Sequence, residues 1–415
     1  MTNRQTLLAV CGLACGAASV AQGQSFTGVG DLSGGSFRSE AMGVSSDGLT
    51  VVGSSEFAAG QTRAFTFAGG TMTPLDDVDV YRPVVAYAIS DNGVVIGKAL
   101  GPGGSEAYKL HNGTFRALGG TVPGGALGSC AYAIAADGRT VIGSREIAGP
   151  KVEACLWFGP APLGLGFLDP SDDVSVAFGI SADGSVTVGG SAGPGGQTVA
   201  FMSSGGVMVA LPTFGGTFTE AHAISDDGKV IVGAGRGYSS GTHAFSYAVA
   251  SGVLTDLGEL DGGDDFSDAL AVNADGSVIV GQSGQASGTV AMIWDATNGM
   301  RNLKDVLVAQ GVSNLAGWTL TRANGVSNDG LVVCGTGINP SGFTEGWVAV
   351  LLPPAPPCPA DFDGDGTVDF FDYDAFVMCF EGGACPPGKT ADFDQDGTVD
   401  FFDYDAFVVA FETPC

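Results

Sequence analysis

The sequence predicts an all-β chain, a seven-bladed β-propeller, followed by a small α-helical module at the C-terminal end. Three observations predict this architecture. One short phrase recurs seven times between residues 41 and 335, each copy contains an Asp-Gly or Asn-Gly pair, and a different acidic and aromatic phrase is written twice after residue 358. The chain also holds 69 glycines among 415 residues. Glycine at this density without a collagen period favours tight turns between strands.

Residues 1–23 have the composition of a secretory signal peptide. Arg4 precedes an apolar stretch from Leu7 to Val20 that ends in small residues. We expect this segment to be removed without lipidation. Lipidation at Cys11 or Cys15 is the alternative, since each cysteine matches half of the lipoprotein signal.

Charge and hydropathy restrict the location and the partners. No later segment is an apolar run long enough to cross a bilayer, so no transmembrane segment is expected. The formal net charge is −28. Binding to nucleic acid needs a basic surface, so this class is excluded, and anionic membrane surfaces are disfavoured. The predicted location is extracellular, either free or attached to the cell surface, where cysteines can oxidise.

The repeated phrase predicts the propeller, which we assign to residues 24–352. Its copies begin at Ala41, Ala86, Ala131, Ala177, Ala221, Ala269 and Ala323, with spacings of 45, 45, 46, 44, 48 and 54 residues. A period of this size is typical of solenoids and propellers. Each phrase reads as two short strands around a hairpin turn, and two further strand-like runs follow. Four strands per repeat make one propeller blade.

The ends of the repeat region predict a closed ring. The seventh repeat ends after its third strand, "GWVAVLL" at 346–352, and lacks a fourth. Near the N-terminus, "FTGVGDLSGG" is similar to the fourth strand "LTDLGELDGG" at 254–263. We therefore expect residues 25–33 to pair beside 346–352 and complete the last blade, which removes exposed sheet edges.

The repeat region resembles the HAF-repeat family of extracellular proteins. The tripeptide His243-Ala244-Phe245 is present once, and Ala64-Phe65 and Ala200-Phe201 occupy the same place in other repeats. The resemblance implies a repeat fold and brings no assigned activity.

Polar residues of the repeats are interpreted first as structural. The hairpin residues Asp47, Asn92, Asp137, Asp183, Asp227, Asp275 and Asp329 each precede a glycine, as turn geometry requires. His222 occupies a position that holds Met42, Tyr87, Tyr132, Phe178, Leu270 and Asn324 in the other repeats. This position predicts packing, with a ligand or catalytic role for His222 as the alternative. No catalytic residue is predicted, although carboxylate pairs for glycoside hydrolysis, being remote in sequence, stay open.

The tail carries the strongest motif. A Pro-rich linker at 353–357 leads into a module at 358–415, where "ADFDGDGTVDFFDYDAF" at 360–376 returns as "ADFDQDGTVDFFDYDAF" at 391–407. Loop positions 1, 3, 5, 7, 9 and 12 are Asp361, Asp363, Asp365, Thr367, Asp369 and Asp372, then Asp392, Asp394, Asp396, Thr398, Asp400 and Asp403. Oxygen ligands at these positions, with glycine at position 6, form an EF-hand calcium loop. The sequence therefore predicts two bound Ca²⁺ ions.

The tail resembles type I dockerins, and specifically the Gly-Cys type found as a C-terminal anchor. Position 12 is Asp instead of Glu, one helix follows each loop, and cysteines flank the module. The resemblance implies docking to a cohesin-like or cell-envelope protein through loop positions 10 and 11, which are Phe370, Phe371, Phe401 and Phe402. We expect these pairs to be exposed as an interface. Packing on the opposite loop is the alternative.

Helical periodicity places the core of the module on one face of each helix. These faces hold Val368, Tyr373, Phe376, Val377 and Phe380, and Val399, Tyr404, Phe407, Val408 and Phe411. The two valines at loop position 8 also suit a short β contact between the loops.

The cysteines of the tail predict two disulfides. The second copy has Ala410 in place of Cys379, so packing does not demand sulfur there, and we pair Cys379 with Cys385. Cys358 and Cys415 are expected to join the two ends of the module. Cys130 and Cys155 are a further candidate pair within one blade.

These observations favour a secreted, calcium-binding propeller held by a dockerin-like anchor, acting as an extracellular binding or surface-display protein. A glycan is a candidate ligand of the propeller. One alternative is a carbohydrate-active enzyme, a glycoside hydrolase or lyase, tethered through the same module. Another is a structural component of an extracellular matrix.

Overall fold

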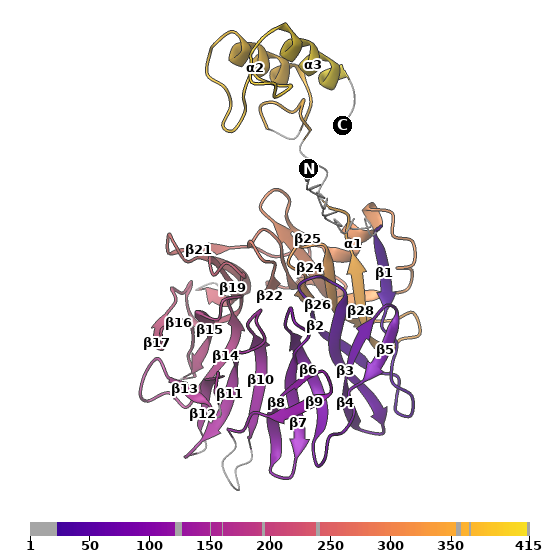
Figure 1. The fold of residues 1–415 in the computed structure, drawn as a ribbon, viewed down its shortest axis with the longest axis vertical. Coiled ribbons are helices and arrows are strands. Elements are labelled where there is room, and N and C mark those ends of the chain that lie inside the picture. Colours follow the sequence, from indigo (N-terminus) through magenta and orange to yellow (C-terminus); the bar gives the residue numbers. More distant parts are fainter. Residues whose placement is uncertain are drawn as a thin grey trace, which may run out of the picture. The chain divides into compact units, whose positions relative to one another are not determined.

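The computed structural model describes residues 23–412, except 121–126, 150, 160, 193–195, 238–240, 354–357 and 365–366. The predicted signal peptide, apart from Gly23, and most of the predicted linker therefore lie outside the described residues. The chain divides into two compact units, Met1–Leu352 and Pro353–Cys415. Each unit is described by itself (Figure 1).

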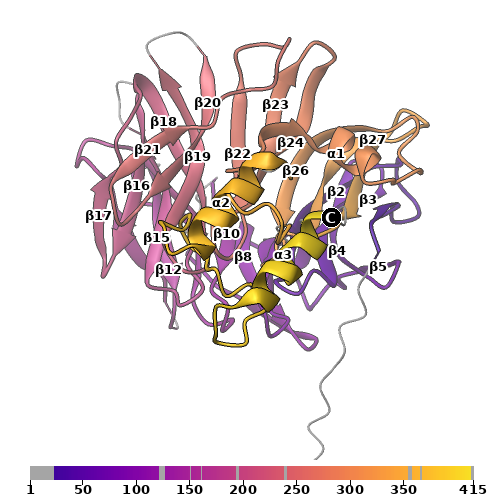
Figure 2. The same cartoon turned by 90° about the horizontal axis from the view of Figure 1, so that it is seen from above.

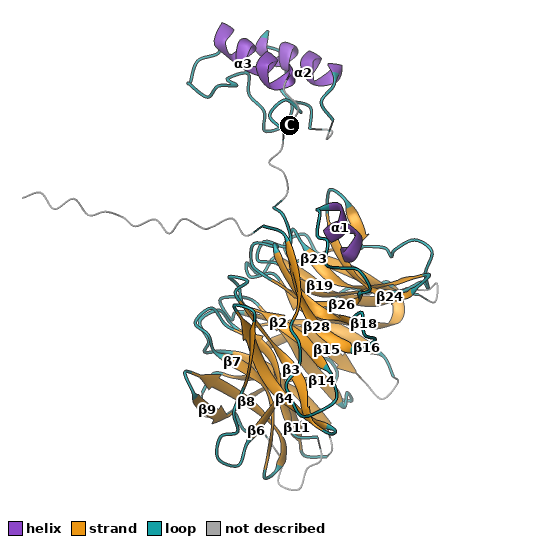
Figure 3. Cartoon of the chain, turned by 90° about the vertical axis from the view of Figure 1, so that its right-hand side faces the viewer, coloured by secondary structure: helices purple, strands orange, loops and turns teal. Residues whose placement is uncertain are grey.

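The first unit is a β-propeller built from successive groups of antiparallel strands, so the all-β prediction is confirmed (Figure 3). The first three groups are β2 (Ser39–Val44), β3 (Thr50–Ala58), β4 (Gln61–Ala68) and β5 (Thr71–Pro74); β6 (Arg82–Ile89), β7 (Val95–Gly101), β8 (Gly104–His111) and β9 (Thr114–Ala117); and β10 (Ser129–Ile134), β11 (Val141–Ile147), β12 (Lys151–Trp157) and β13 (Leu163–Gly166). Each group corresponds to one repeat of the sequence.

The later groups continue this arrangement. They are β14 (Val174–Ile180), β15 (Val186–Ala192), β16 (Thr198–Ser204) and β17 (Val207–Ala210); β18 (Gly215–Ile224), β19 (Val230–Gly237), β20 (Thr242–Ala248) and β21 (Val253–Asp256); β22 (Ser267–Val272), β23 (Ile279–Gln285), β24 (Gly288–Asp295) and β25 (Gly299–Asn302); and β26 (Thr319–Val326), β27 (Val332–Ile338) and β28 (Thr344–Val350). Single parallel bridges, Val152 to Val174 and Thr198 to Phe218, merge three groups into one larger sheet. The blade number stays a prediction.

The N-terminal strand closes the ring beside the predicted segment, although the strand itself spans residues 25–28 of the predicted 25–33. β1 (Ser25–Gly28) pairs antiparallel with β28, with Phe26 opposite Ala349 and Gly28 opposite Trp347. The backbone N–H of Val29 then donates to the carbonyl of Gly346 at 2.9 Å. The sheet order β1-β28-β27-β26 therefore joins the first strand of the chain to the last group.

Turn chemistry explains the spacing that recurs inside each hairpin. In the first repeat, Asp47 Oδ1 accepts hydrogen bonds from the Ser45 hydroxyl at 2.6 Å and from the Leu49 backbone N–H at 3.0 Å. Gly48 follows with φ of 73°, a conformation that glycine adopts at little cost. Asp183 and Asp227 accept the same pair of bonds in later repeats. The structural interpretation of these carboxylates is confirmed.

The first strands of successive groups contact one another around a central axis (Figure 2). Ala41 and Ala86 on these strands are fully buried. A Cβ atom added at Gly53 or Gly97 would lie 2.0 Å from a carbonyl oxygen of the neighbouring first strand. Small residues are therefore required where first and second strands approach each other.

One helix in the propeller was not predicted. α1 (Leu303–Ala309) begins after Asn302, whose side chain accepts from the Lys304 N–H at 2.9 Å. Leu303 and Leu307 are buried in a core cluster with Phe26 and Trp318. This helix occupies the longer interval between the sixth and seventh repeats.

The second unit contains α2 (Phe370–Phe380) and α3 (Phe401–Glu412), one after each acidic loop. Its core is Phe362, Phe376, Cys379, Ala391 and Phe407. The rings of Phe376 and Phe407 stack with centroids 4.0 Å apart. The expected core position of Val368 and Val399 is wrong, because both side chains are exposed. The expected β contact between the two loops is also wrong, because neither valine lies in a strand.

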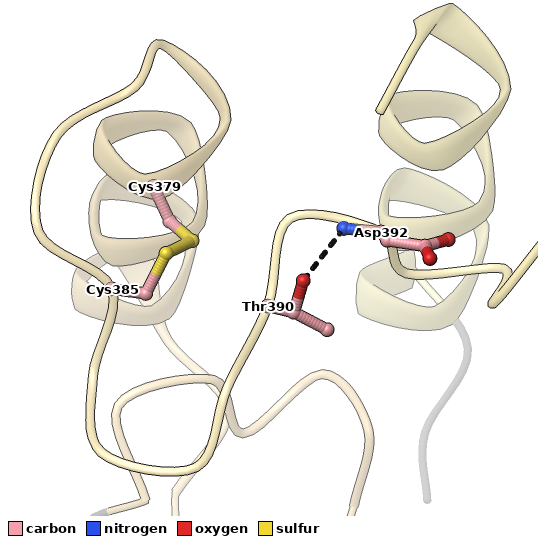
Figure 4. Close-up of a disulfide and its surroundings, with 4 residues drawn as sticks. All are labelled: Cys379, Cys385, Thr390 and Asp392. Carbon is pink, nitrogen blue, oxygen red and sulfur yellow. Dashed lines mark hydrogen bonds between the residues drawn. A yellow bond between two sulfur atoms is a disulfide. The ribbon is translucent and has the colours of Figure 1, made fainter. Parts of the chain in front are cut away.

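The cysteines match the predictions in part. Cys379 on α2 is bonded to Cys385, as predicted, and the chain then leads to Thr390 and the second loop (Figure 4). Cys415, the predicted partner of Cys358, lies outside the described residues. Cys130 and Cys155 are both free and buried, so their pairing is wrong.

The blade geometry explains why that pairing fails. Cys130 lies on β10 and Cys155 on β12, with β11 between them. Strands two positions apart in a sheet are separated by about 9.6 Å, which is too far for a disulfide. Cys334 is also free, and burial raises the pKa of its thiol to about 12. Within the described ranges, no helix is long and apolar enough to cross a membrane.

Candidate functional site

The first acidic loop brings three predicted ligands together. Carboxylate oxygens of Asp361, Asp363 and Asp372 lie within 4.8 Å of one another. Asp372 is buried, and its two oxygens accept from the backbone N–H groups of Asp363 at 3.0 Å and Asp369 at 2.8 Å. These bonds hold the position-12 carboxylate toward the loop. Asp365 lies outside the described residues.

The second loop repeats the arrangement. Oxygens of Asp392, Asp394 and Asp403 lie within the same 4.8 Å. Asp403 accepts from the N–H groups of Phe393 at 2.6 Å, Asp394 at 3.1 Å and Asp400 at 2.8 Å. Asp392 Oδ1 is buried and has no hydrogen-bond partner. A buried anionic oxygen without a partner is costly, and a cation among three carboxylates removes that cost.

The remaining predicted ligands lie in the same loops with different roles. Asp369 is the N-cap of α2 and accepts from the Phe371 N–H at 2.7 Å, and Asp400 makes the equivalent bond to Phe402 at 2.8 Å. Asp396 Oδ1 accepts from both the N–H and the hydroxyl of Thr398. Thr367 is at the corresponding place in the first loop. The carboxylates at position 9, Asp369 and Asp400, therefore also fix the first turns of α2 and α3.

Charge crowding is visible in the second loop. The N–H of Asp396 lowers the pKa of Asp394, but desolvation and the charges of Asp396, Asp403 and Asp392 outweigh it and raise the pKa above its usual value. The N–H of Asp400 is the largest cause of the lowered pKa of Asp403. All the side-chain donors are hard oxygen atoms, so the set fits Ca²⁺.

The four predicted docking residues are exposed. Phe370, Phe371, Phe401 and Phe402 are between 68% and 71% exposed. Phe370 stacks on Tyr373 and Phe401 on Tyr404, each pair with centroids 6.1 Å apart. The alternative of packing on the opposite loop is not what the second unit shows.

A cavity of about 770 Å³ lies on the axis of the propeller. The residues that share the His222 position in the repeats all line it: Met42, Tyr87, Tyr132, Phe178, His222, Leu270 and Asn324. They come from the first strand of every group, β2 through β26. The sequence interpretation of this position as packing was incomplete, because these side chains face a cavity. The volume of the cavity falls in the range of small-molecule binding sites.

His222 is the charged centre of this cavity. Its Nε2 lies 3.2 Å from Glu220 Oε2, and its Nδ1 lies 3.0 Å from Asp268 Oδ1 and 3.1 Å from the carbonyl of Ala269. Burial lowers the pKa of His222, but its bonds to the two carboxylates outweigh this and raise it to about 10. The imidazole therefore keeps its proton at neutral pH and has no lone pair with which to act as a base.

A second histidine is also held by carboxylates. His243 Nδ1 lies 2.8 Å from Asp256 Oδ2, and Nε2 lies 2.6 Å from Asp265 Oδ1 and 3.6 Å from Glu259 Oε2. Burial lowers the pKa of His243, and the bonds to Asp265 and Asp256 raise it to about 9. With both ring nitrogens protonated, this cluster is an ion-pair network at the start of β20.

No protein-family model and no curated protein matches the chain. Solved structures show the fold. The β-propeller domain of the Trilobed protease from Pyrococcus furiosus has a TM-score of 0.50 at 11% identity, covering 79% of this chain and 99% of that chain. Oligogalacturonate lyase from Vibrio parahaemolyticus has a TM-score of 0.50 at 10% identity, covering 75% and 90%.

TolB from Acinetobacter baumannii has a TM-score of 0.41 at 15% identity, covering 60% of this chain, and the chain spans 62% of its length. Identities this low establish the β-propeller alone. The Pyrococcus domain is described as having an open velcro topology. In the present chain β1 instead pairs with β28.

Proposed function

We propose that this chain is a secreted, calcium-stabilised binding protein that displays a β-propeller through a dockerin-like C-terminal anchor. The observation that carries the proposal is the repeated carboxylate constellation at loop positions 1, 3 and 12. The unpartnered, buried Asp392 Oδ1 supports a cation in that constellation. An acidic solvated tail has no reason to bury a carboxylate oxygen in this way.

In each loop, Ca²⁺ supplies the positive charge that allows the carboxylates to stay close together. Asp361, Asp363 and Asp372 would hold it in the first loop, and the carbonyl of Thr367 and the position-9 carboxylate would complete the set. Asp372 also caps α2 through its bond from the Asp369 N–H. Binding therefore stabilises loop and helix together.

Exposed aromatic pairs support the anchoring role. Phe370 and Phe371 begin α2, and Phe401 and Phe402 begin α3, so each pair stands directly beside a calcium loop. Exposed aromatic clusters are enriched in protein interfaces. We assign them to docking on a cohesin-like or cell-envelope protein, with one equivalent face on each half of the module.

The central cavity supports ligand binding by the propeller. Its lining combines a row of aromatic rings with His222, Glu220 and Asp268. A histidine that stays protonated between two carboxylates is suited to positioning polar groups and unsuited to abstracting a proton. This arrangement is suited to recognition of polar groups on a ligand.

Fractionation of cells that secrete the full chain tests the proposal. The wild-type chain is expected in the envelope fraction in millimolar calcium and in the medium after a calcium chelator is added. Replacing Phe370, Phe371, Phe401 and Phe402 with Ser should release it even in calcium. A control variant replaces the exposed propeller residues Phe158 and Phe343 with Ser and should remain bound.

Two outcomes contradict the proposal. Equal distribution of the wild-type chain and the four-residue variant argues against the phenylalanine anchor. Retention of the wild-type chain in the envelope fraction after chelation argues against calcium-dependent anchoring.

A further inference from the structure

The central cavity has two chemically different sides. On β6, β10 and β14 the lining residues are Tyr87, Tyr132 and Phe178. On β18, β22 and β26 the positions two residues before the lining position are Glu220, Asp268 and Arg322, and all three line the same cavity. The corresponding positions on β6, β10 and β14 are Val85, Cys130 and Val176. The charged lining residues therefore come from the later repeats, where Phe218 and Phe266 also line the cavity, and the lining on β6, β10 and β14 is aromatic and apolar.

The aromatic side is a continuous wall. Ring centroids are 5.2 Å apart between Tyr87 and Tyr132, 5.4 Å between Tyr132 and Phe178, and 5.9 Å between Phe178 and His222. The three aromatic side chains are only half-buried. They leave part of their ring surface open toward the cavity, where a flat apolar face can lie against it.

The charged side carries groups of both signs. Glu220 and Asp268 lie beside protonated His222, while Arg236 and Arg322 also line the cavity. Glu40 lines a smaller adjoining cavity of about 270 Å³ and is paired with Arg38. The central cavity therefore offers both hydrogen-bond donors and acceptors, from two carboxylates and three basic groups.

This mixture of charges discriminates among ligand classes. An anion meets Glu220 and Asp268 as well as the basic groups, and a cation meets the basic groups as well as the carboxylates, so repulsion offsets part of the attraction for either ion. A hydrocarbon covers the charged side without pairing it, which costs free energy. A ligand with hydroxyl groups on its edges and an apolar C–H face satisfies both sides, because a hydroxyl both donates and accepts hydrogen bonds.

We propose that the central cavity binds a neutral sugar, with a ring face on Tyr132 and its neighbours and hydroxyl groups directed to Glu220, Asp268 and Arg322. This inference rests on the proposed binding role of the propeller and names its ligand class. The cavity volume of about 770 Å³ fits sites for ligands of this kind.

Isothermal titration calorimetry on the full chain in calcium tests the inference. The probes are tetrasaccharides of glucose, mannose and xylose, with tetragalacturonate as the charged counterpart. At least one neutral tetramer should bind with a Kd of about 1 mM or lower, and tetragalacturonate should bind at least about tenfold more weakly. Tyr132→Ala should weaken binding about tenfold, since one ring face loses its contact.

Arg322→Gln keeps the test decisive if Tyr132→Ala does not fold, because Arg322 is exposed and contributes donors to the charged side. It should weaken binding about fivefold. The matched control is Arg139→Gln in a hairpin outside the cavity lining, where the guanidinium is exposed, and its affinity should equal that of the wild type.

Three results overturn the inference: no neutral tetramer binds, tetragalacturonate binds more tightly than every neutral tetramer, or neither cavity variant changes the affinity. The result of the sugar-binding test can be distinguished from the result of the envelope-attachment test. A chain that stays attached to the envelope in calcium but binds no neutral tetramer refutes the sugar site and leaves the anchor. A chain that binds the sugar but does not attach to the envelope refutes the anchor and leaves the sugar site.

Discussion

Replacing Phe26 with Ala tests how the propeller ring is closed. Phe26 is 3% exposed, and its ring centroid lies 5.0 Å from that of Trp318 and 6.1 Å from that of Trp347. It is the large apolar residue of a four-residue strand, β1, which pairs with β28, and Asn314 also donates to the carbonyl of Phe26. Truncating a buried phenylalanine costs about 3–5 kcal/mol, which is a large part of the 5–15 kcal/mol that stabilises a typical domain.

Urea unfolding followed by tryptophan fluorescence is the assay, because Trp318 and Trp347 contact the replaced side chain. We expect the free energy of unfolding of the propeller to fall by about 3 kcal/mol or more, with a change in the native emission spectrum. Phe158→Ala is the matched control: Phe158 is 72% exposed, and its loss should change the free energy by at most about 0.5 kcal/mol. A Phe26→Ala variant within about 1 kcal/mol of the wild type, with unchanged native fluorescence, refutes closure by this residue.

Three further predictions concern calcium, pH and the disulfide. Replacing Asp392 and Asp394 together with Asn should reduce calcium binding to the full chain from two ions to one by calorimetry, and an unchanged stoichiometry contradicts the second site. The pKa of His243 is about 9 in the folded chain and about 6.5 when unfolded, so its stabilising effect is complete below pH 6.5 and is lost as pH rises through 9. The melting temperature of the wild type should therefore fall between pH 7 and 9.5, and that of His243→Gln should fall less. Melting temperatures that fall equally with pH in both proteins contradict the ion-pair network. Cys379→Ala removes a bond that spans 6 residues and should destabilise the tail by about 2 kcal/mol in thermal unfolding, whereas an unchanged tail transition shows that the bond with Cys385 is dispensable.

The propeller was predictable because its determinants are local and repeated. The hairpin at Asp47 needs only a serine, an acceptor and a glycine within four residues, and the same hydrogen bonds recur in other repeats. The closing strand was predictable because one repeat lacks a strand and the N-terminus supplies one. The helix α1 was missed because it lies in a single insertion, so no other repeat supports it. The 54-residue spacing was its only signal.

In the tail, the helix period was extended too far toward the N-terminus. Val368 was placed on the apolar face of a helix, but the capping box of Asp369 and Asp372 starts α2 at Phe370. A residue before the N-cap has left the helical path, so its side chain no longer follows the 3.6-residue period. Phe362 and Phe393 supply the missing core contacts instead, with centroids 5.2 and 5.8 Å from Phe376. Their identical place at loop position 2 in both copies was the available signal.

The central cavity could not be predicted from an alignment of the repeats, because the alignment does not show which residues face the axis of the ring. The alignment places His222 in one column with six other side chains, and a column of large residues reads as packing. In a closed ring this column faces the axis, where no partner sheet covers it, so the same residues enclose a space. Glu220 shares β18 with His222, but Asp268 reaches the imidazole only because β22 is the next first strand around the axis. The chemistry of the cavity therefore arises from the order of the repeats around the ring: three consecutive repeats contribute aromatic and apolar side chains, the next three add charged ones, and the two sets surround one space only once β1 has closed the ring.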